Sequence, residues 1–255
     1  MCPDDENGLD PSHPRYESIR RRQRLVAGFK DGIVAPEGLI AQGRGEMFDY
    51  LLGEETIAPA LSAERAAAAL MTISRKPVIS VNGNLAALCP GEVVALAAAT
   101  GAAIEVNLFH WSAERAVLIR KLLESKGARK VLAENPDSVL DGINHDRAKC
   151  HSAGIFSADT VLVPLEDGDR TFALADMGKK VISVDLNPLS RTSLCACISI
   201  VDEATRALPN ITRFSEELKG DAKRAEQILE AFDNSAALRE IYRHITSRFK
   251  KLAKG

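Results

Sequence analysis

Runs of consecutive apolar residues alternate with amphipathic stretches through the middle of the chain. The runs include VISV, IEVNL, VLVPL and VISVDL, each short enough to form one strand. Continuous apolar runs of this length are typical of strands covered on both faces, as in a parallel sheet. The alternation predicts an α/β fold, a mostly parallel Rossmann-like sheet with helices on both faces. The expected strands cover 77–81, 103–108, 130–133, 160–165, 180–186 and 198–201, and the expected helices between them cover 91–100, 113–126 and 171–177.

Helical periodicity extends to both sides of this alternating region. Before it, helices are expected at 14–33, 47–52 and 62–74, and a glycine-rich loop, GLIAQGRG, at 38–45. After it, helices are expected at 204–219, 221–232 and 236–254. We therefore expect a flexible tail at 1–12 and a single α/β domain at 13–255. This domain would comprise a helical part at 13–75, the sheet core at 77–203 and C-terminal helices at 204–255.

Composition narrows the classes of function. The net charge is −2, so no overall positive field would attract nucleic acid or an acidic membrane surface. The longest apolar run, at 66–73, is too short to cross a bilayer, and the first residues lack the apolar core of a signal peptide. We therefore expect a cytoplasmic protein without nucleic-acid or membrane partners.

The five cysteines are scattered along the chain, and an odd number makes a poor disulfide framework. Cys195 and Cys197 flank Ala196, so on a strand both sulfur atoms would lie on one face. A metal pair is one interpretation of this spacing. Buried small side chains are the simpler one, because no second Cys or His pair stands at ligand spacing.

Polar residues follow almost every expected strand. Because the carboxyl ends of parallel strands meet at one edge of a sheet, these residues should converge on a ligand site there. The alternative is that strand ends are polar simply because they continue into loops. The residues are Asn82 and Asn84; Asn107; Asp167, Asp169 and Arg170; Asp185, Asn187 and Arg191; and Asp202 and Glu203.

The common nucleotide-binding motifs are absent. No GxxxxGK[ST] loop occurs, and the GxGxxG pattern that starts at Gly43 has Phe48 in place of its third glycine. Any use of ATP must therefore depend on arginines and loop amides. Arg44 suits that task, because its glycine neighbours would let the backbone approach a phosphate that the guanidinium grips. The alternative is a solvated arginine in a surface turn.

Two other polar groups have equally balanced interpretations. Asp167, Asp169 and Arg170 could hold Mg²⁺, orient an amine or face a phosphate, or the acidic pair could simply favour a helix N-terminus. Asp185 and Asn187 stand where such sheets commonly meet a ribose or a base. Their alternative is an Asx turn before Pro188.

Six longer segments are more specific. They are HPRYESI at 13–19, GLIAQGRGEMFDYLLGE at 38–54, PVISVNGNLAAL at 77–88, IEVNLF at 104–109, VLVPLEDGDRT at 161–171 and VISVDLNPLSRT at 181–192. Together they resemble the archaeal phosphopantothenate synthetases, also called 4-phosphopantoate–β-alanine ligases. The resemblance covers most of the chain. It implies a dinucleotide-binding-like α/β fold with helical additions, and a homodimer.

The resemblance also implies a reaction in coenzyme A biosynthesis. In it, 4-phosphopantoate, β-alanine and ATP give 4′-phosphopantothenate, AMP and diphosphate through an acyl-adenylate. Mg²⁺ and arginines would offset the charge that accumulates during adenylation. An NAD-dependent dehydrogenase and a non-catalytic nucleotide-binding protein are the alternative functions for such a sheet.

The expected site combines the strand-end argument with the resemblance, and its metal ligands are left open. The catalytic candidates are Arg44, Asp169 and Arg170. The substrate candidates are Asn82, Asn84 and Asp167. The ATP contacts implied by the resemblance are Arg22, Arg44, Asp185, Leu186, Asn187, Arg191, Thr192, Asp202 and Glu203.

Several positions depart from the usual family pattern. Gln42 replaces a common His, and Glu203 replaces a common Asn, which puts its side-chain contact to the nucleotide in question. Phe172 replaces a common Glu. His110 and Trp111 replace a common Tyr-Arg pair.

Overall fold

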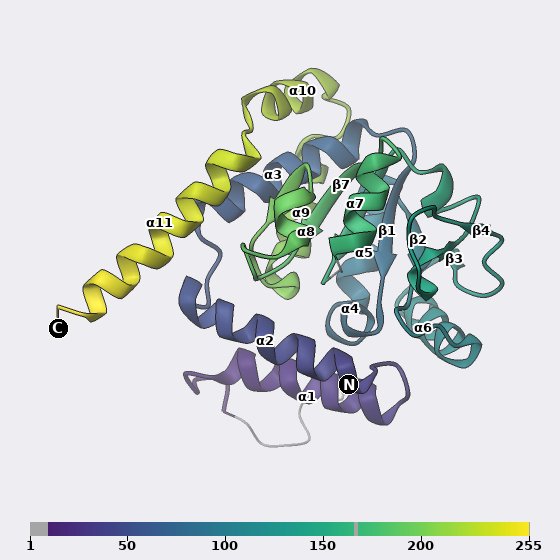
Figure 1. Ribbon diagram of the computed structural model, residues 1–255, viewed down its shortest axis with the longest axis horizontal. Coiled ribbons are helices and arrows are strands. Elements are labelled where there is room, and N and C mark those ends of the chain that lie inside the picture. Colours follow the sequence, from purple (N-terminus) through teal and green to yellow (C-terminus); the bar gives the residue numbers. More distant parts are fainter. Residues whose placement is uncertain (1–9, 166–167, 255) are drawn as a thin grey trace.

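The computed structural model describes residues 10–165 and 168–254 and has a parallel sheet at its centre (Figure 1). The sheet order is β3-β2-β1-β6-β7-β8, so the chain leaves β1 towards β2 and β3 on one side, and continues through β6, β7 and β8 on the other. This arrangement confirms the expected α/β fold. The switch in direction lies between β1 and β6, where ligands commonly bind at the carboxyl edge of such sheets. The strands are β1 (Pro77–Val81), β2 (Ala103–Val106), β3 (Val131–Leu132), β6 (Thr160–Pro164), β7 (Lys180–Val184) and β8 (Ile198–Ile200).

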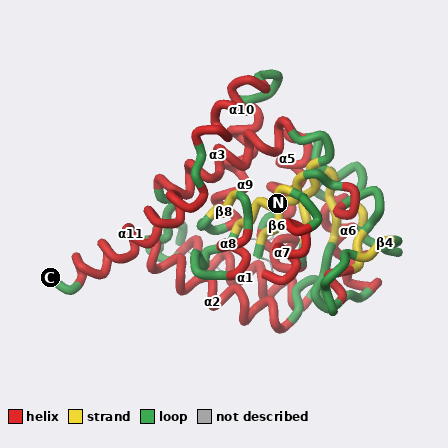
Figure 2. Tube along the Cα trace, turned by 45° about the horizontal axis from the view of Figure 1, so that its top comes forward, coloured by secondary structure: helices red, strands yellow, loops and turns green. Residues whose placement is uncertain are grey.

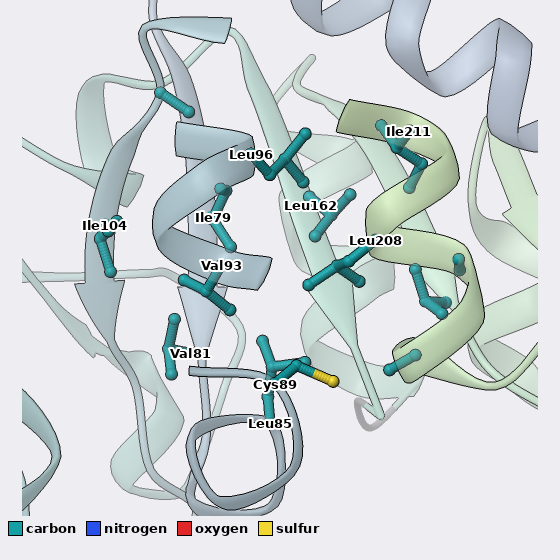
Figure 3. Packing of buried hydrophobic residues seen from close by; sticks show 14 of the residues in the cluster. Ile79, Val81, Leu85, Cys89, Val93, Leu96, Ile104, Leu162, Leu208 and Ile211 are labelled. Carbon is teal, nitrogen blue, oxygen red and sulfur yellow. The ribbon is translucent and has the colours of Figure 1, made fainter. Parts of the chain in front are cut away.

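Helices and loops bury both faces of the sheet, as the continuous apolar runs predict. Figure 3 shows Ile79 and Leu162 on the face that packs against Leu208. Neighbouring strand residues such as Val78 and Val161 belong to a second core cluster, because successive strand side chains point to opposite faces. The first face is covered by α3 (Ala58–Ile73), α5 (Pro90–Thr100), α6 (Ala113–Ser125) and α9 (Ala204–Glu217), and the second by α7 (Gly168–Asp176) and the segment 138–158.

The N- and C-terminal helices surround this core. In Figure 1, α1 (Tyr16–Lys30) and α2 (Pro36–Leu52) lie across the end of the sheet to which the strand arrows point. Towards the C-terminus, α10 (Ala222–Ala231) precedes α11 (Asn234–Leu252), which reaches away from the body in both Figure 1 and Figure 2. Among the described residues, no helix combines the length and apolarity that crossing a membrane requires.

The expected loop at 38–45 is wrong, because this segment lies inside α2. Glycine costs roughly 0.5–1 kcal/mol relative to alanine in a helix interior, which made a loop the better local interpretation. Packing overrides that preference at Gly38, where a Cβ atom would lie 2.2 Å from the Asn84 Oδ1 atom. Pro36 at the first turn also favours the helix. Gly43 has no such packing reason, since nothing lies within 4 Å of its Cβ position.

Short elements around the sheet were also missed. Residues after β1 and β7 form the helices α4 (Gly83–Leu88) and α8 (Arg191–Cys195). The strand interpretation of Cys195 and Cys197 is therefore wrong, because Cys195 ends α8 and Cys197 precedes β8. Four further short elements connect β3 to β6: the antiparallel pair β4 (Ser138–Val139) and β5 (Lys149–Cys150), and the 3₁₀ turns η2 (Asp146–Ala148) and η3 (Ile155–Ser157).

Candidate active site at the carboxyl edge of the sheet

Helix α2 crosses the carboxyl edge of the sheet from β1 towards β8. At its start, the Gly38 carbonyl accepts a hydrogen bond from the Asn84 amide at 2.8 Å, just beyond β1. Gly45 packs on Leu186 beyond β7. Near the end of α2, Asp49 binds Arg206, which follows β8. The helix therefore places its side chains over the region where the polar strand ends converge (Figure 1).

Two exposed arginines face this edge from the N-terminal helices. Arg22 of α1 donates to both Glu46 carboxylate oxygens, at 3.1 and 3.0 Å, and to the Tyr50 hydroxyl. The Glu46 hydrogen bond raises the pKa of Arg22 above its ordinary value. Arg44 of α2 is exposed and makes no hydrogen bond or ion pair within the described part of the chain. It is thus available to an anion.

The loop after β7 is shaped by two Asx turns. The Asp185 carboxylate accepts from the Asn187 amide at 2.9 Å, and the Asn187 side chain accepts from the Leu189 amide at 3.0 Å. These bonds confirm the turn interpretation of both residues, which still leaves part of each side chain available to a ligand. Burial raises the pKa of Asp185, whereas Ser190, Asn187 and the Arg44 charge act in the opposite direction. Leu186 between them is buried.

Helices α7 and α8 meet through an exposed ion pair. Arg191, at the first turn of α8, lies 2.5 Å from the Asp169 carboxylate at the start of α7. Ser190 caps α8 by accepting from the Ser193 amide, and Thr192 behind it is buried. Asp169 therefore occupies a helix N-terminus, as its structural alternative predicted. Asp167 lies outside the described residues.

Arg170 lies in the protein interior. Its side chain is fully buried, and its Nη1 atom donates to the Ser80 hydroxyl of β1 at 3.0 Å. Arg170 belongs to the first turn of α7. Only tertiary contacts make this burial favourable, because an isolated buried guanidinium is very costly.

A buried ionic network joins α1 and α2 to the end of β8. Arg206 donates to Asp49 and to Asp202, with Nη2–oxygen distances of 2.5 and 2.6 Å. Burial alone would lower the pKa of Arg206, but the hydrogen bonds and charges of the two aspartates raise it. Arg21 of α1 also donates to Asp49, at 3.2 Å. Sequence reasoning missed this network, since its partners lie up to 157 positions apart.

Glu203 serves mainly as a helix cap. Its carboxylate accepts from the Thr205 amide at 2.6 Å at the start of α9, and it lies 3.8 Å from Arg21. Burial raises the pKa of Glu203, and Arg21 opposes that shift. Both contacts use the side chain within the protein. Glu203 replaces the Asn that is common in the family, and this difference had put a contact between its side chain and the nucleotide in question. The contacts within the protein agree with that.

Asn82 and Asn84 hold the backbone together around β1. Asn82 accepts from the Leu85 amide and donates to the carbonyls of Pro164 and Leu165. Asn84 donates to Gly38 and is 8% exposed. These bonds tie β1 to β6 and to α2, so both amides shape the edge whether or not they touch a substrate.

A small cavity opens between α1, α2 and the ends of β7 and β8. Its interior is about 10 Å³, roughly the room that one water molecule needs. The Gln42 side-chain oxygen is buried, and no group among the described residues donates a hydrogen bond to it. The lining residues are Ser18, Arg21, Arg22, Gln42, Glu46, Asp49, Leu186 and Glu203, which include three of the expected ATP contacts.

The described residues contain no group of three or more His, Cys, Asp or Glu side chains that could hold a metal ion. Beside nucleotides, Mg²⁺ is usually held by one or two carboxylates together with phosphates and water.

Glu64 adds a buried carboxyl group beneath the network. It is fully buried on α3 and accepts from the Asn210 amide at 2.9 Å. Burial raises the pKa of Glu64 to about 9, and the neighbouring Asp202 carboxylate acts in the same direction. Glu64 is thus protonated at neutral pH.

Glu64→Gln should make the protein more stable at alkaline pH. A carboxyl group with a raised pKa contributes stability at low pH, and that contribution is lost as the pH rises from about 4.5 towards 9. Glutamine keeps a donor towards Asp202 and an acceptor for Asn210 without titrating. Chemical denaturation should show that the stability of the variant relative to wild type increases by about 4 kcal/mol between pH 5 and pH 8. The exposed Glu216→Gln should show no such trend, and a constant offset for Glu64→Gln would refute the protonation.

Comparison with known proteins agrees with these observations. The family model described as phosphopantothenate/pantothenate synthetase matches residues 59–248. A 4-phosphopantoate–β-alanine ligase of Methanosarcina mazei is 53% identical over 242 residues, covering 94% of this chain and 95% of the relative. Proteins with the same name from Thermococcus onnurineus and Methanospirillum hungatei are 47% and 56% identical. These matches cover 97% and 84% of this chain, and 95% and 87% of the respective relatives.

Proposed function

The chain belongs to the phosphopantothenate/pantothenate synthetase family, and we propose that it uses ATP to activate its acid substrate at the carboxyl edge of the sheet. Its function is that of the family, the ligation of 4-phosphopantoate to β-alanine on the route to coenzyme A. Because the chain belongs to this family, the two alternative functions, an NAD-dependent dehydrogenase and a non-catalytic nucleotide-binding protein, are rejected. ATP as the co-substrate, Mg²⁺ as its companion and the cytoplasmic location remain predictions.

The proposed chemistry follows from the inertness of a carboxylate towards amines. A carboxylate oxygen of 4-phosphopantoate attacks the α-phosphorus of ATP, and diphosphate leaves. The amine of β-alanine then attacks the activated carbonyl carbon, loses a proton and displaces AMP. Charge accumulates on the phosphates during the first step, so preorganised arginines should stabilise that transition state.

The availability of Arg44 is the observation that carries this proposal. Arg21, Arg22, Arg191 and Arg206 at this edge all have carboxylate partners, whereas Arg44 has none within ion-pair distance among the described residues. The adjacent Gly43 leaves open space along the helix, at a position where no packing contact explains a glycine. Glycine commonly occurs where a ligand approaches the backbone.

We assign the nucleotide to the β7–β8 side of the edge. The cavity residues Arg22 and Leu186 would border it, and the unpartnered Gln42 oxygen would accept a hydrogen bond from it. Six further residues surround the same region, as proposed contacts to the nucleotide or as supports for those contacts. They are Asp185, Asn187, Arg191, Thr192, Asp202 and Glu203. Mg²⁺ would arrive bound to the phosphates and offset their charge.

Asp169 and Arg170 remain catalytic candidates of different kinds. Asp169 is exposed at the edge and forms an ion pair with Arg191, a proposed ATP contact, so its carboxylate can reach a ligand. Arg170 is buried against Ser80, so we propose that it positions the first turn of α7 against β1. Asp167 stays a prediction as a substrate contact.

We also propose a homodimer. Phe249 and Leu252 on the projecting end of α11 are 54% and 76% exposed, and large apolar side chains on a protruding helix favour burial against a partner. Light scattering after size-exclusion chromatography should give twice the chain mass of 27.5 kDa. A single-chain mass at micromolar concentration would contradict the dimer.

The products distinguish the proposed adenylation from phosphorylation. Attack at the α-phosphorus must release AMP and diphosphate, whereas an acyl-phosphate route would release ADP and phosphate. We expect one AMP per phosphopantothenate by chromatography, with both organic substrates required for rapid turnover. Stoichiometric ADP would reject the adenylate route while leaving the ligase function intact.

A further inference from the structure

The C-terminal helix α11 is fixed at its start to the sheet, close to the proposed nucleotide region. The Ser199 amide of β8 donates to the Asn234 side-chain oxygen at 2.7 Å, and the Asn234 side-chain amide donates to the Ala196 carbonyl at 3.2 Å. Asn234 is the first residue of α11. The helix therefore leaves the edge of β8 in a defined position.

The next turns of α11 share a small core with two elements of the site. Leu238 and Ile241 of α11 are buried in one cluster with Leu52, the last residue of α2, and with Leu186 beyond β7. Leu186 also lines the small cavity beside the proposed nucleotide region. Because protein interiors are close-packed, such a cluster holds its elements at fixed distances from one another. Helix α11 thus supports this part of the edge from the side of the protein body.

Two side chains of α11 then bind the backbone of the same two elements. The Tyr242 hydroxyl donates to the Pro188 carbonyl, in the loop after β7, at 2.9 Å. The His244 ring donates from Nε2 to the Leu52 carbonyl, at the end of α2, at 2.8 Å. A single turn of α11 therefore joins the loop after β7 to the helix that carries Arg44.

The loop after β7 depends on such an external contact for its placement. Its internal shape comes from the Asx turns of Asp185 and Asn187 and from the Ser193 hydroxyl, which donates to the Asn187 carbonyl at 2.9 Å. These bonds all join residues within 185–193, so they cannot fix where the loop stands relative to α2. The Tyr242 hydroxyl comes from 54 positions further along the chain, on a separate helix that also contacts α2.

We propose that Tyr242 is a positioning residue for the ligase reaction, which acts through the Pro188 carbonyl to place the loop after β7 for ATP. Asn187 precedes Pro188, and Arg191 begins α8 directly after the loop. A shift of the Pro188 carbonyl would therefore move both of these proposed ATP contacts, and ligand contacts need a geometry held within about half an ångström. This inference rests on the proposed function, in which ATP occupies the β7–β8 side.

Steady-state kinetics of Tyr242→Phe test the positioning role. Phenylalanine keeps the ring that packs against the cluster of Leu186 and Ile241, and only the hydroxyl is lost. We expect the KM for ATP to rise about five- to tenfold, the effect of losing roughly one neutral hydrogen bond. The KM for 4-phosphopantoate at saturating ATP should stay within about twofold. A merely structural hydroxyl would instead lower the melting temperature and the active fraction, and hence the apparent kcat, without changing the KM for ATP.

Hydrogen exchange would show whether the loop is the part that responds. The Leu189 amide donates to the Asn187 side chain inside the loop. Its exchange should be at least about threefold faster in Tyr242→Phe than in wild type, while exchange of the β1 amides should not change, because local opening depends on local contacts. Unchanged exchange of the Leu189 amide would contradict an action through the loop.

Thr246→Val is the matched control for removing a hydroxyl from α11. The exposed Thr246 hydroxyl donates to the Tyr242 carbonyl at 2.8 Å, so its hydrogen bond stays within the helix. Its KM for ATP should equal that of wild type. An unchanged KM for ATP in Tyr242→Phe, or an equal rise in the KM for both substrates, would overturn the positioning role. A wild-type protein that forms phosphopantothenate without consuming ATP would instead refute the proposed function on which this role depends.

Discussion

Arg206→Met is expected to lower the free energy of unfolding by about 3 kcal/mol. The Arg206 guanidinium is shared by Asp49 and Asp202, whose side chains are almost completely inaccessible to solvent. Removing it leaves two buried carboxylates with too few partners, and breaking a buried ion pair from one side typically costs about 3–5 kcal/mol. The lower end applies here because Arg21 still reaches Asp49, and Thr56 still donates to Asp202.

Urea denaturation at pH 7 would measure this loss. The matched control is Arg213→Met on the same helix, whose exposed pair with Glu217 should contribute less than about 1 kcal/mol. Ligase activity should also decrease, because the network anchors α1 and α2 over the edge. Equal stability of the two variants would show that the network does not hold these helices in place.

Arg44→Ala is expected to lower kcat/KM for ATP by about 30- to 1,000-fold. Loss of a charged, bidentate phosphate contact in a site that excludes water corresponds to roughly 2–4 kcal/mol of transition-state stabilisation. The melting temperature should hardly change, because Arg44 is exposed and has no partner among the described residues to lose. Arg44→Lys should restore only part of the activity, since an ammonium group cannot reproduce the guanidinium fork.

The exposed Lys30→Ala at the end of α1 serves as the control for loss of one positive charge. Its kcat/KM for ATP should remain within about twofold of wild type, because surface charges in water are strongly screened. Wild-type kinetics in Arg44→Ala would remove Arg44 from the nucleotide site. A large drop in its melting temperature would show instead that the residue supports the fold.

The glycine-rich segment shows why part of the site could not be predicted. Its glycines lower helix propensity, so local reasoning favoured a loop around Arg44. The helix forms because Gly38 allows close contact with Asn84, a residue from a different element. The role of Arg44 as an ATP contact stays a prediction, and the structure places this residue, exposed, on a helix that crosses the sheet edge.

Arg170 and Glu64 show the same limitation for charged residues. Both would be placed at the surface by their residue type, since Arg and Glu are rarely buried without partners. Arg170 is buried because Ser80 of β1 accepts from it, and Glu64 because Asn210 and Asp202 engage its carboxyl group. Their partners lie 90 and 146 positions away for Ser80 and Asn210, so no local pattern signals them.

Local patterns alone determined the alternation of strands and helices, the burial of both sheet faces and the polar residues at the strand ends. These properties depend on neighbours within a few positions, where the periods of strands and helices operate. The tertiary structure alone decided the order β3-β2-β1-β6-β7-β8, the path of α2 over the carboxyl edge and the network of Arg21, Asp49, Arg206 and Asp202. These features arise when distant segments meet, because the stability of a buried charge depends on the partner that folding brings to it.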